Sequence, residues 1–81
     1  MRLNDETIYR DLRFSLGRHP QTGQPCLLFP VECGFLGYMA CLQISEETFE
    51  EYRRDPYSAL PFIERQQGRS PQELRELGFE V

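Results

Sequence analysis

The sequence predicts an α+β fold in which a three-stranded antiparallel sheet is followed by two to three short helices packed on one face. Before Ile44, short apolar runs are separated by glycine and proline, which is typical of strands joined by turns. After Ser45, apolar side chains recur roughly every three to four positions, which is typical of amphipathic helices. At 81 residues the chain has room for one small domain, strand-rich over residues 7–44 and helical over residues 45–81.

The first strand is predicted over residues 7–16, whose second half alternates apolar and polar side chains without interruption. A competing interpretation makes residues 5–11 a helical turn with Asp5 as its N-cap, because apolar side chains also recur there at helical spacing. The following residues 17–25 contain two glycines and two prolines and are expected to form the loop of a hairpin.

Two further strands are predicted over residues 26–31 and 38–44, with a turn over residues 32–37 between them. Pro30 has no amide hydrogen to donate, so it marks an edge, a bulge or the end of the second strand. Apolar side chains occupy both alternating sets of positions in that strand. The sheet is therefore expected either to be covered on both faces or to use one face as an interface.

The first helix is predicted over residues 46–54, because Ser45 is a favourable N-cap and acidic residues in the first turn suit the helix dipole. A second helix is predicted over residues 56–67, beginning with a proline at its first position. Ser70 begins a capping-box pattern, which predicts a last short helix through Leu77.

The charge balance of the chain argues against two classes of partner. The net charge is −4 and the isoelectric point is near 4.9, so phosphate backbones and anionic lipid surfaces would be repelled. No apolar run approaches the length of about 18 residues that a membrane-spanning helix needs. An odd number of cysteines and a polar N-terminal segment are expected of a protein of the reducing cytoplasm.

The residues able to carry out catalysis or bind metal are few and unfavourably spaced. His19 is the only histidine and lies in a glycine- and proline-rich segment, where an exposed loop residue is expected. Cys26, Cys33 and Cys41 lack the close Cys pair that is typical of structural zinc sites. The sequence therefore predicts no catalytic residue, no metal site and no cofactor, and the chain is not expected to be an enzyme.

An acidic helix face is the first of two predicted partner-binding features. Four carboxylates lie in the first two turns of the predicted helix, at Glu46, Glu47, Glu50 and Glu51. They form either a solvated face or a surface that steers a basic protein partner towards the helix.

The second predicted feature is an apolar pair on a tight turn. Phe35 and Leu36 are flanked by Gly34 and Gly37, and two large apolar side chains are unusual on a turn that faces water. They either fold back onto the core or anchor a partner or a second copy of the chain.

These features predict a non-enzymatic, acidic protein-binding module with a basic protein partner. In size, acidity and order of elements the chain is similar to many small bacterial inhibitors, so an immunity protein, an antitoxin or a phage anti-defence protein is the expected type. The alternative is a structural homo-oligomer, such as a homodimer, or an accessory subunit that self-associates through the apolar sheet face.

Overall fold

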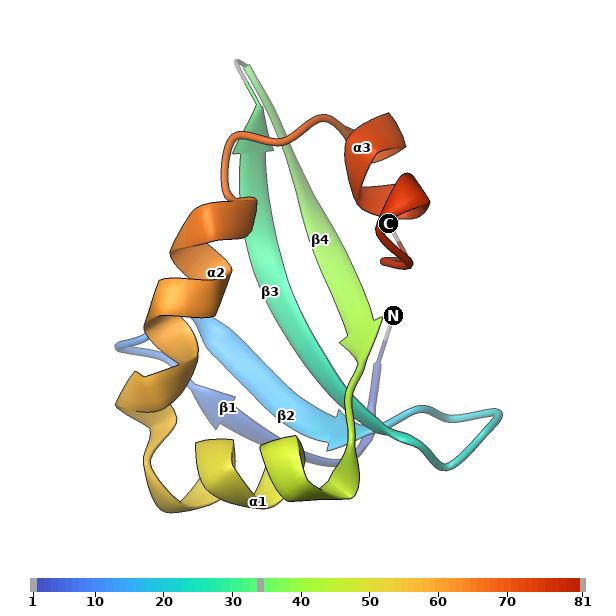
Figure 1. Ribbon diagram of the computed structural model, residues 1–81, viewed down its shortest axis with the longest axis vertical. Coiled ribbons are helices and arrows are strands. Elements are labelled where there is room, and N and C mark those ends of the chain that lie inside the picture. The colour runs from blue at the N-terminus through green and yellow to red at the C-terminus, as the bar shows by residue number, and fades with distance from the viewer. Residues whose placement is uncertain (1, 34, 81) are drawn as a thin grey trace.

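The computed structural model describes residues 2–33 and 35–80, with Cys33 and Leu36 described in their backbone only. One antiparallel sheet contains four strands in the order β1-β2-β3-β4. These are β1 (Asn4–Tyr9), β2 (Phe14–Arg18), β3 (Pro25–Cys33) and β4 (Leu36–Gln43). Helices follow the strands, so the predicted α+β class is confirmed, whereas the prediction of three strands is wrong (Figure 1).

The extra strand arises because the segment predicted as one strand over residues 7–16 is a hairpin. The chain reverses after β1, where the amide of Arg13 donates to the carbonyl of Tyr9 at 2.9 Å. Arg13 has a φ of 61°, a left-handed conformation that a tight turn requires. Tyr9 then pairs with Phe14. The alternative of a helical turn is wrong for the residues up to Tyr9, which belong to β1.

β3 and β4 form the longest hairpin, paired from Cys26 with Gln43 to Cys33 with Leu36. Both predicted strands are present, and both extend further into the turn than expected. Pro30 lies inside β3 opposite Met39 and does not end the strand.

Three α-helices and one 3-10 helix follow the sheet. They are α1 (Glu46–Arg54), η1 (Pro56–Ala59), α2 (Leu60–Gln66) and α3 (Pro71–Glu76). The N-caps predicted for α1 and α3 are confirmed, since the side chains of Ser45 and Ser70 accept from the amides of Thr48 and Glu73. The helix predicted over residues 56–67 is divided, because Pro61 lacks an amide hydrogen and is placed in the first turn of α2.

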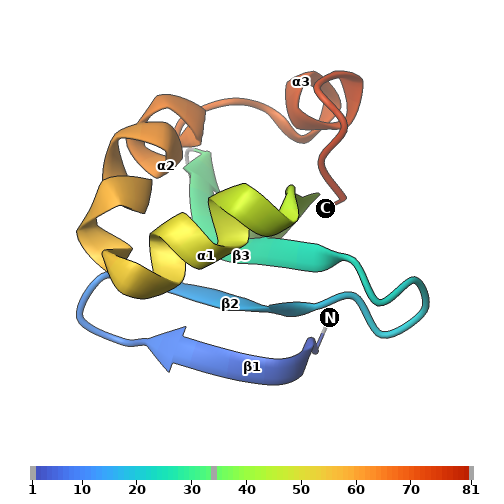
Figure 2. The same cartoon turned by 60° about the horizontal axis from the view of Figure 1, so that its bottom comes forward.

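Most of the core lies between the sheet and the helices, on what we call the helix-covered face (Figures 1 and 2). Its buried side chains are Phe14, Leu16, Leu27, Phe29, Val31 and Ala40 from the sheet, with Phe49, Ala59, Ile63, Leu74 and Phe79 from the rest. The ring of Phe79 meets that of Phe29 edge-on at 5.8 Å and stacks on that of Phe62 at 6.2 Å. Phe49, Ile63 and Leu74 lie in α1, α2 and α3, so all three α-helices contribute to one cluster.

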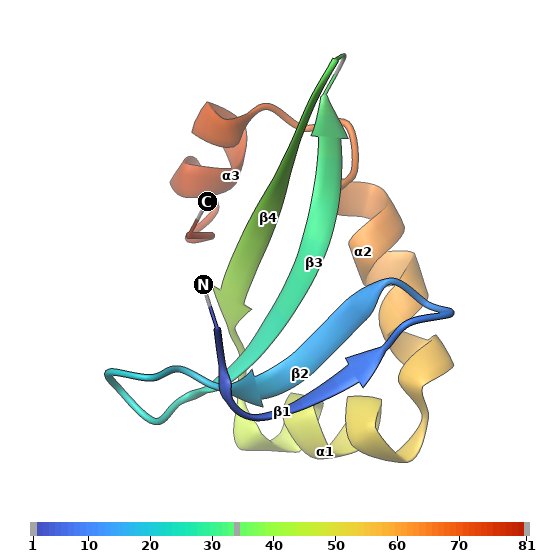
Figure 3. The ribbon, with the colours of Figure 1, turned by 180° about the vertical axis from the view of Figure 1, so that it is seen from behind.

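The opposite side of the sheet, seen from behind in Figure 3, is here called the open face. It carries a much smaller cluster of buried side chains. The register aligns Ile8, Ser15, Leu28 and Cys41 in one row across the four strands. Its buried cluster consists of Leu3, Cys26, Leu28 and Cys41. Ile8 is 57% exposed, and Met39, on the same face, is 46% exposed. Only part of this face is therefore covered by the described chain.

None of the helices in residues 2–33 and 35–80 has both the length and the apolar character needed to cross a bilayer.

Candidate functional site

The two predicted partner-binding features lie at opposite ends of the molecule (Figure 1). Phe35 and Leu36 are at the tip of the β3–β4 hairpin, whereas α1 lies beyond its other end, after Gln43. A strand rises about 3.4 Å per residue, so the ladder between these ends spans roughly 24 Å. The structure therefore does not bring the apolar turn and the acidic helix together into one site.

The hairpin tip presents an exposed aromatic side chain. Phe35 is fully exposed. The first of the two alternatives predicted for it, packing back onto the core, is therefore wrong. The side chain of Leu36 lies outside the described residues. Phe35 is therefore free to contact another molecule, at the far end from the acidic helix.

Two of the four helix acids, Glu46 and Glu50, bind arginines of the same chain. The guanidinium of Arg18 donates two hydrogen bonds to the carboxylate of Glu46, at 2.9 Å and 3.2 Å. These bonds lower the pKa of Glu46 and raise that of Arg18. Glu50 pairs with Arg53 at 3.3 Å. We call Glu46 and Glu50 the inner acid pair.

The inner acid pair holds two arginines over one buried aromatic ring. The guanidinium carbons of Arg18 and Arg53 lie 5.3 Å and 5.5 Å from the ring centroid of Phe49. Cations near the face of an aromatic ring are attracted by its quadrupole. Because Arg18 belongs to β2 and Phe49 to α1, this cluster joins the helix to the sheet, and its acids have a structural role.

The other two acids, Glu47 and Glu51, form what we call the outer acid pair. Both are exposed, and neither makes a hydrogen bond or ion pair within the described part of the chain. They are four residues apart on α1, so their like charges oppose helix formation slightly. Four acids that look equivalent in sequence thus divide into two paired and two unpaired carboxylates.

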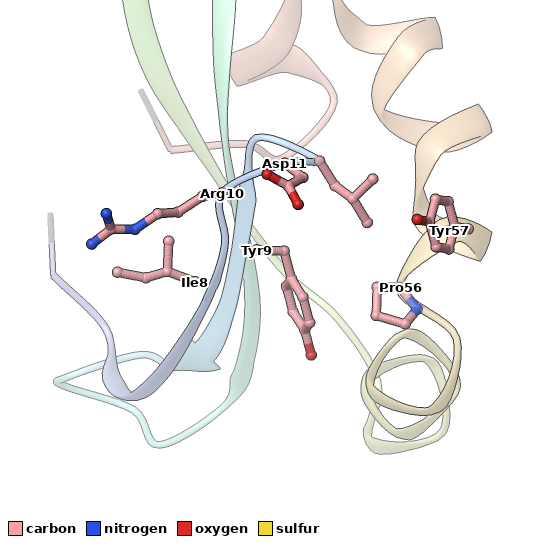
Figure 4. Close-up of a pocket in the computed structure, with 7 residues that line it drawn as sticks. Ile8, Tyr9, Arg10, Asp11, Pro56 and Tyr57 are labelled. Atoms are coloured by element: carbon pink, nitrogen blue, oxygen red, sulfur yellow. The ribbon is translucent and has the colours of Figure 1, made fainter.

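A cleft that the sequence did not predict lies between the β1–β2 turn and η1, with a volume of about 340 Å³ (Figure 4). We call it the aromatic cleft; its lining residues are Ile8, Tyr9, Arg10, Asp11, Leu12, Pro56 and Tyr57. The ring of Tyr9 packs against that of Phe14 at 5.0 Å, whereas Tyr57 is 68% exposed. No local pattern indicates this cleft, because it forms only where two distant segments meet.

His19 is buried, with 5% exposure, so the prediction of an exposed loop histidine is wrong. Its Nδ1 accepts a hydrogen bond from the amide of Gln21 at 3.1 Å, which places the ring proton on Nε2. Nε2 lies 3.3 Å from the carboxylate of Glu80 and donates to it. Because both ring nitrogens are occupied, His19 ties loop and C-terminal segment together and has no nitrogen left to act as a base.

Two cysteines, Cys26 and Cys41, have side chains that the structure describes. Cys26 and Cys41 are buried free thiols, and burial raises the pKa of both, that of Cys41 to about 12. The thiolate is the reactive form, and a raised pKa favours the protonated thiol at neutral pH. Within residues 2–33 and 35–80, no group of three or more His, Cys, Asp or Glu residues is placed to hold a metal ion.

The geometry thus offers three surfaces for contact with other molecules: the outer acid pair, the aromatic cleft and the hairpin tip. In comparisons with known proteins, no family model, no curated protein and no solved structure matches this chain.

Proposed function

We propose that this chain is a non-enzymatic, acidic protein-binding module that docks on a basic protein. An inhibitor is the function that suits such a module best, of the type of a bacterial immunity protein, an antitoxin or a phage anti-defence protein. The observation that carries the proposal is the outer acid pair, Glu47 and Glu51, which is exposed and has no ion pair among the described residues, beside two acids that are paired.

The contrast between the acid pairs supports a role outside the chain. The arginines of the chain neutralise Glu46 and Glu50, and this stabilises the contact between α1 and β2. Glu47 and Glu51 stabilise no contact of this kind, and their mutual repulsion opposes the helix that carries them. A basic partner would offset this repulsion and would be attracted at long range.

The proposal is tested by capturing partners from source-cell lysate on the immobilised chain, and then measuring association rates with the purified partner. Reversal of the outer pair, Glu47→Arg with Glu51→Arg, is expected to slow association at least about tenfold at low salt and to flatten its salt dependence. The matched control is Glu64→Arg with Glu76→Arg, which changes the net charge equally at exposed acids elsewhere. Equal slowing by both variants would show that the rate depends on the total charge and not on the position of the acids. Unchanged rates would exclude α1 as the docking surface.

A second candidate function is self-association through the open face, supported by the exposed Ile8 and Met39 beside the buried row. A stable dimer in sedimentation at micromolar concentration, dissociated by Met39→Asp, is the expected result. Leu77→Asp provides the control, because Leu77 is similarly exposed but lies after α3. A monomer at these concentrations would exclude this function.

A further inference from the structure

We infer that the aromatic cleft receives a cationic side chain of the partner, with arginine preferred. The inference rests on the proposed function, because it specifies how a basic protein would be held once charge has attracted it. Arginine fits best because its guanidinium is planar, stacks on aromatic faces and pairs with carboxylates.

The walls of the aromatic cleft supply the aromatic faces. Figure 4 shows Tyr9 on one side of the cleft and Tyr57 on the other, with Pro56 beside Tyr57. Tyr9 is held in place by its contact with Phe14, whereas Tyr57 is mostly exposed. A cation within about 6 Å of a tyrosine ring centroid is attracted by it, and a ring that is already positioned loses little entropy on binding.

The charges of the aromatic cleft favour a cation over the other occupants. Asp11 lines the cleft and has no ion pair within the described residues. Arg10 also lines it, but its side chain extends to the other side of β1, together with Ile8 (Figure 4). An acidic side chain would be repelled by Asp11, and an apolar one would take water from that carboxylate without replacing its hydrogen bonds.

The position of the aromatic cleft connects it to the outer acid pair. α1 ends at Arg54, and Asp55, which is exposed, leads directly into Pro56, which lines the cleft. Glu51 is one turn before Asp55 on the same segment. A partner attracted by Glu47 and Glu51 would therefore find the cleft at the end of the helix that attracts it.

The test is an NMR titration of the full chain, labelled with ¹⁵N, with the blocked tripeptide acetyl-Gly-Arg-Gly-amide. Saturable shifts are expected at the amides of residues 8–12 and of Tyr57, with weaker or no shifts from the matched peptide that carries leucine. Asp11→Asn and Tyr57→Ala are each expected to weaken binding about two- to fivefold, and Tyr57→Phe is expected to retain it.

The control variants are the reversals at Glu64 and Glu76, which raise the net charge from −4 to 0 but leave the aromatic cleft intact. Equal shifts by the leucine peptide, or no saturable shift by the arginine peptide, would overturn the inference. The result is independent of the association-rate test on Glu47 and Glu51. If the reversal of Glu47 and Glu51 slows association but the arginine peptide does not bind, only the role of the aromatic cleft is disproved. If the arginine peptide binds but the reversal leaves association unchanged, only the docking role of α1 is disproved.

Discussion

The two faces of the sheet are built from the same four strands but are covered very differently. On the helix-covered face, the buried residues of the sheet and of all three α-helices form one continuous cluster. On the open face, the buried cluster has four members, and Ile8 and Met39 remain about half exposed. The comparison teaches that most of the stability is concentrated on one face, whereas the exposed residues of the other face, Ile8 and Met39, can change at little cost to the fold.

The largest effect is expected at the centre of the helix-covered face. Phe29→Ala should destabilise the chain by about 3–5 kcal/mol, because Phe29 is fully buried and its ring meets that of Phe79. Phe35→Ala, the same substitution at the exposed hairpin tip, should change stability by less than about 0.5 kcal/mol. Urea denaturation of both variants measures the difference.

A domain of this size has a small total stability, so Phe29→Ala could abolish folding altogether. Phe29→Leu, which removes less volume, should remain folded and lose about 1 kcal/mol. Equal stability of the variants at Phe29 and Phe35 would contradict the assigned core.

An intermediate effect is expected on the open face. Leu28→Ala should cost about 2–3 kcal/mol, at the low end of the range for buried leucines, because the surrounding cluster is small and can relax into the space. Met39→Ala, one strand away on the same face, should cost less than about 1 kcal/mol because Met39 is already half exposed. A loss at Leu28 as large as that at Phe29 would remove the distinction between the two faces.

The buried thiols of the open face should make stability depend on alkaline pH. The folded chain holds the pKa of Cys41 near 12 against an ordinary value of 9.0, so ionisation favours the unfolded chain as the pH rises above about 9. The free energy of unfolding should therefore decrease from about pH 9 upwards. Replacing Cys26 and Cys41 by alanine should reduce this decrease, and an identical pH profile would show that the thiols are not the cause.

The smallest effects are expected on α1, where they separate the two acid pairs. The pKa of Glu46 is lowered in the folded chain, so its carboxylate stabilises the fold above its ordinary value of 4.5 and loses this effect as the pH falls through the lowered value. Glu46→Gln should therefore lower the melting temperature slightly at neutral pH and have no effect in strong acid. Glu47→Gln should change it less, because the repulsion from Glu51 and the favourable interaction of Glu47 with the helix dipole oppose each other. A loss equal to that of Glu46→Gln would contradict the division of the acids.

The local features of the fold could be predicted from the sequence. α1 begins and ends at the predicted residues, because Ser45 caps it and the apolar spacing continues to its end. The β1–β2 hairpin is not predicted, since the alternation that continues through β2 already begins inside the turn, at Leu12, and Arg13 takes a conformation usually left to glycine or asparagine.

The candidate sites depend still more on distant contacts. Arg18 and Glu46 are 28 positions apart, so nothing in the helix sequence distinguishes the acid that is paired from its unpaired neighbour. The aromatic cleft joins the end of β1 and the β1–β2 turn to Pro56 and Tyr57, and it exists only once the sheet and the helices have assembled. The contact of His19 with Glu80 likewise joins two residues that are 61 positions apart.

The backbone bridge between Cys41 and Glu80 has a consequence for the order of folding. All strand pairs of the sheet join consecutive strands, so the meander can form from nearby segments with little loop-closure entropy. The two hydrogen bonds of the bridge, each 2.7 Å long, instead close a long loop that contains α1, η1, α2 and α3. We expect the segment from α3 to Glu80 to dock last and to open first, so that in native-state hydrogen exchange the amides of Cys41 and Glu80 exchange together, ahead of the amides that pair β2 with β3.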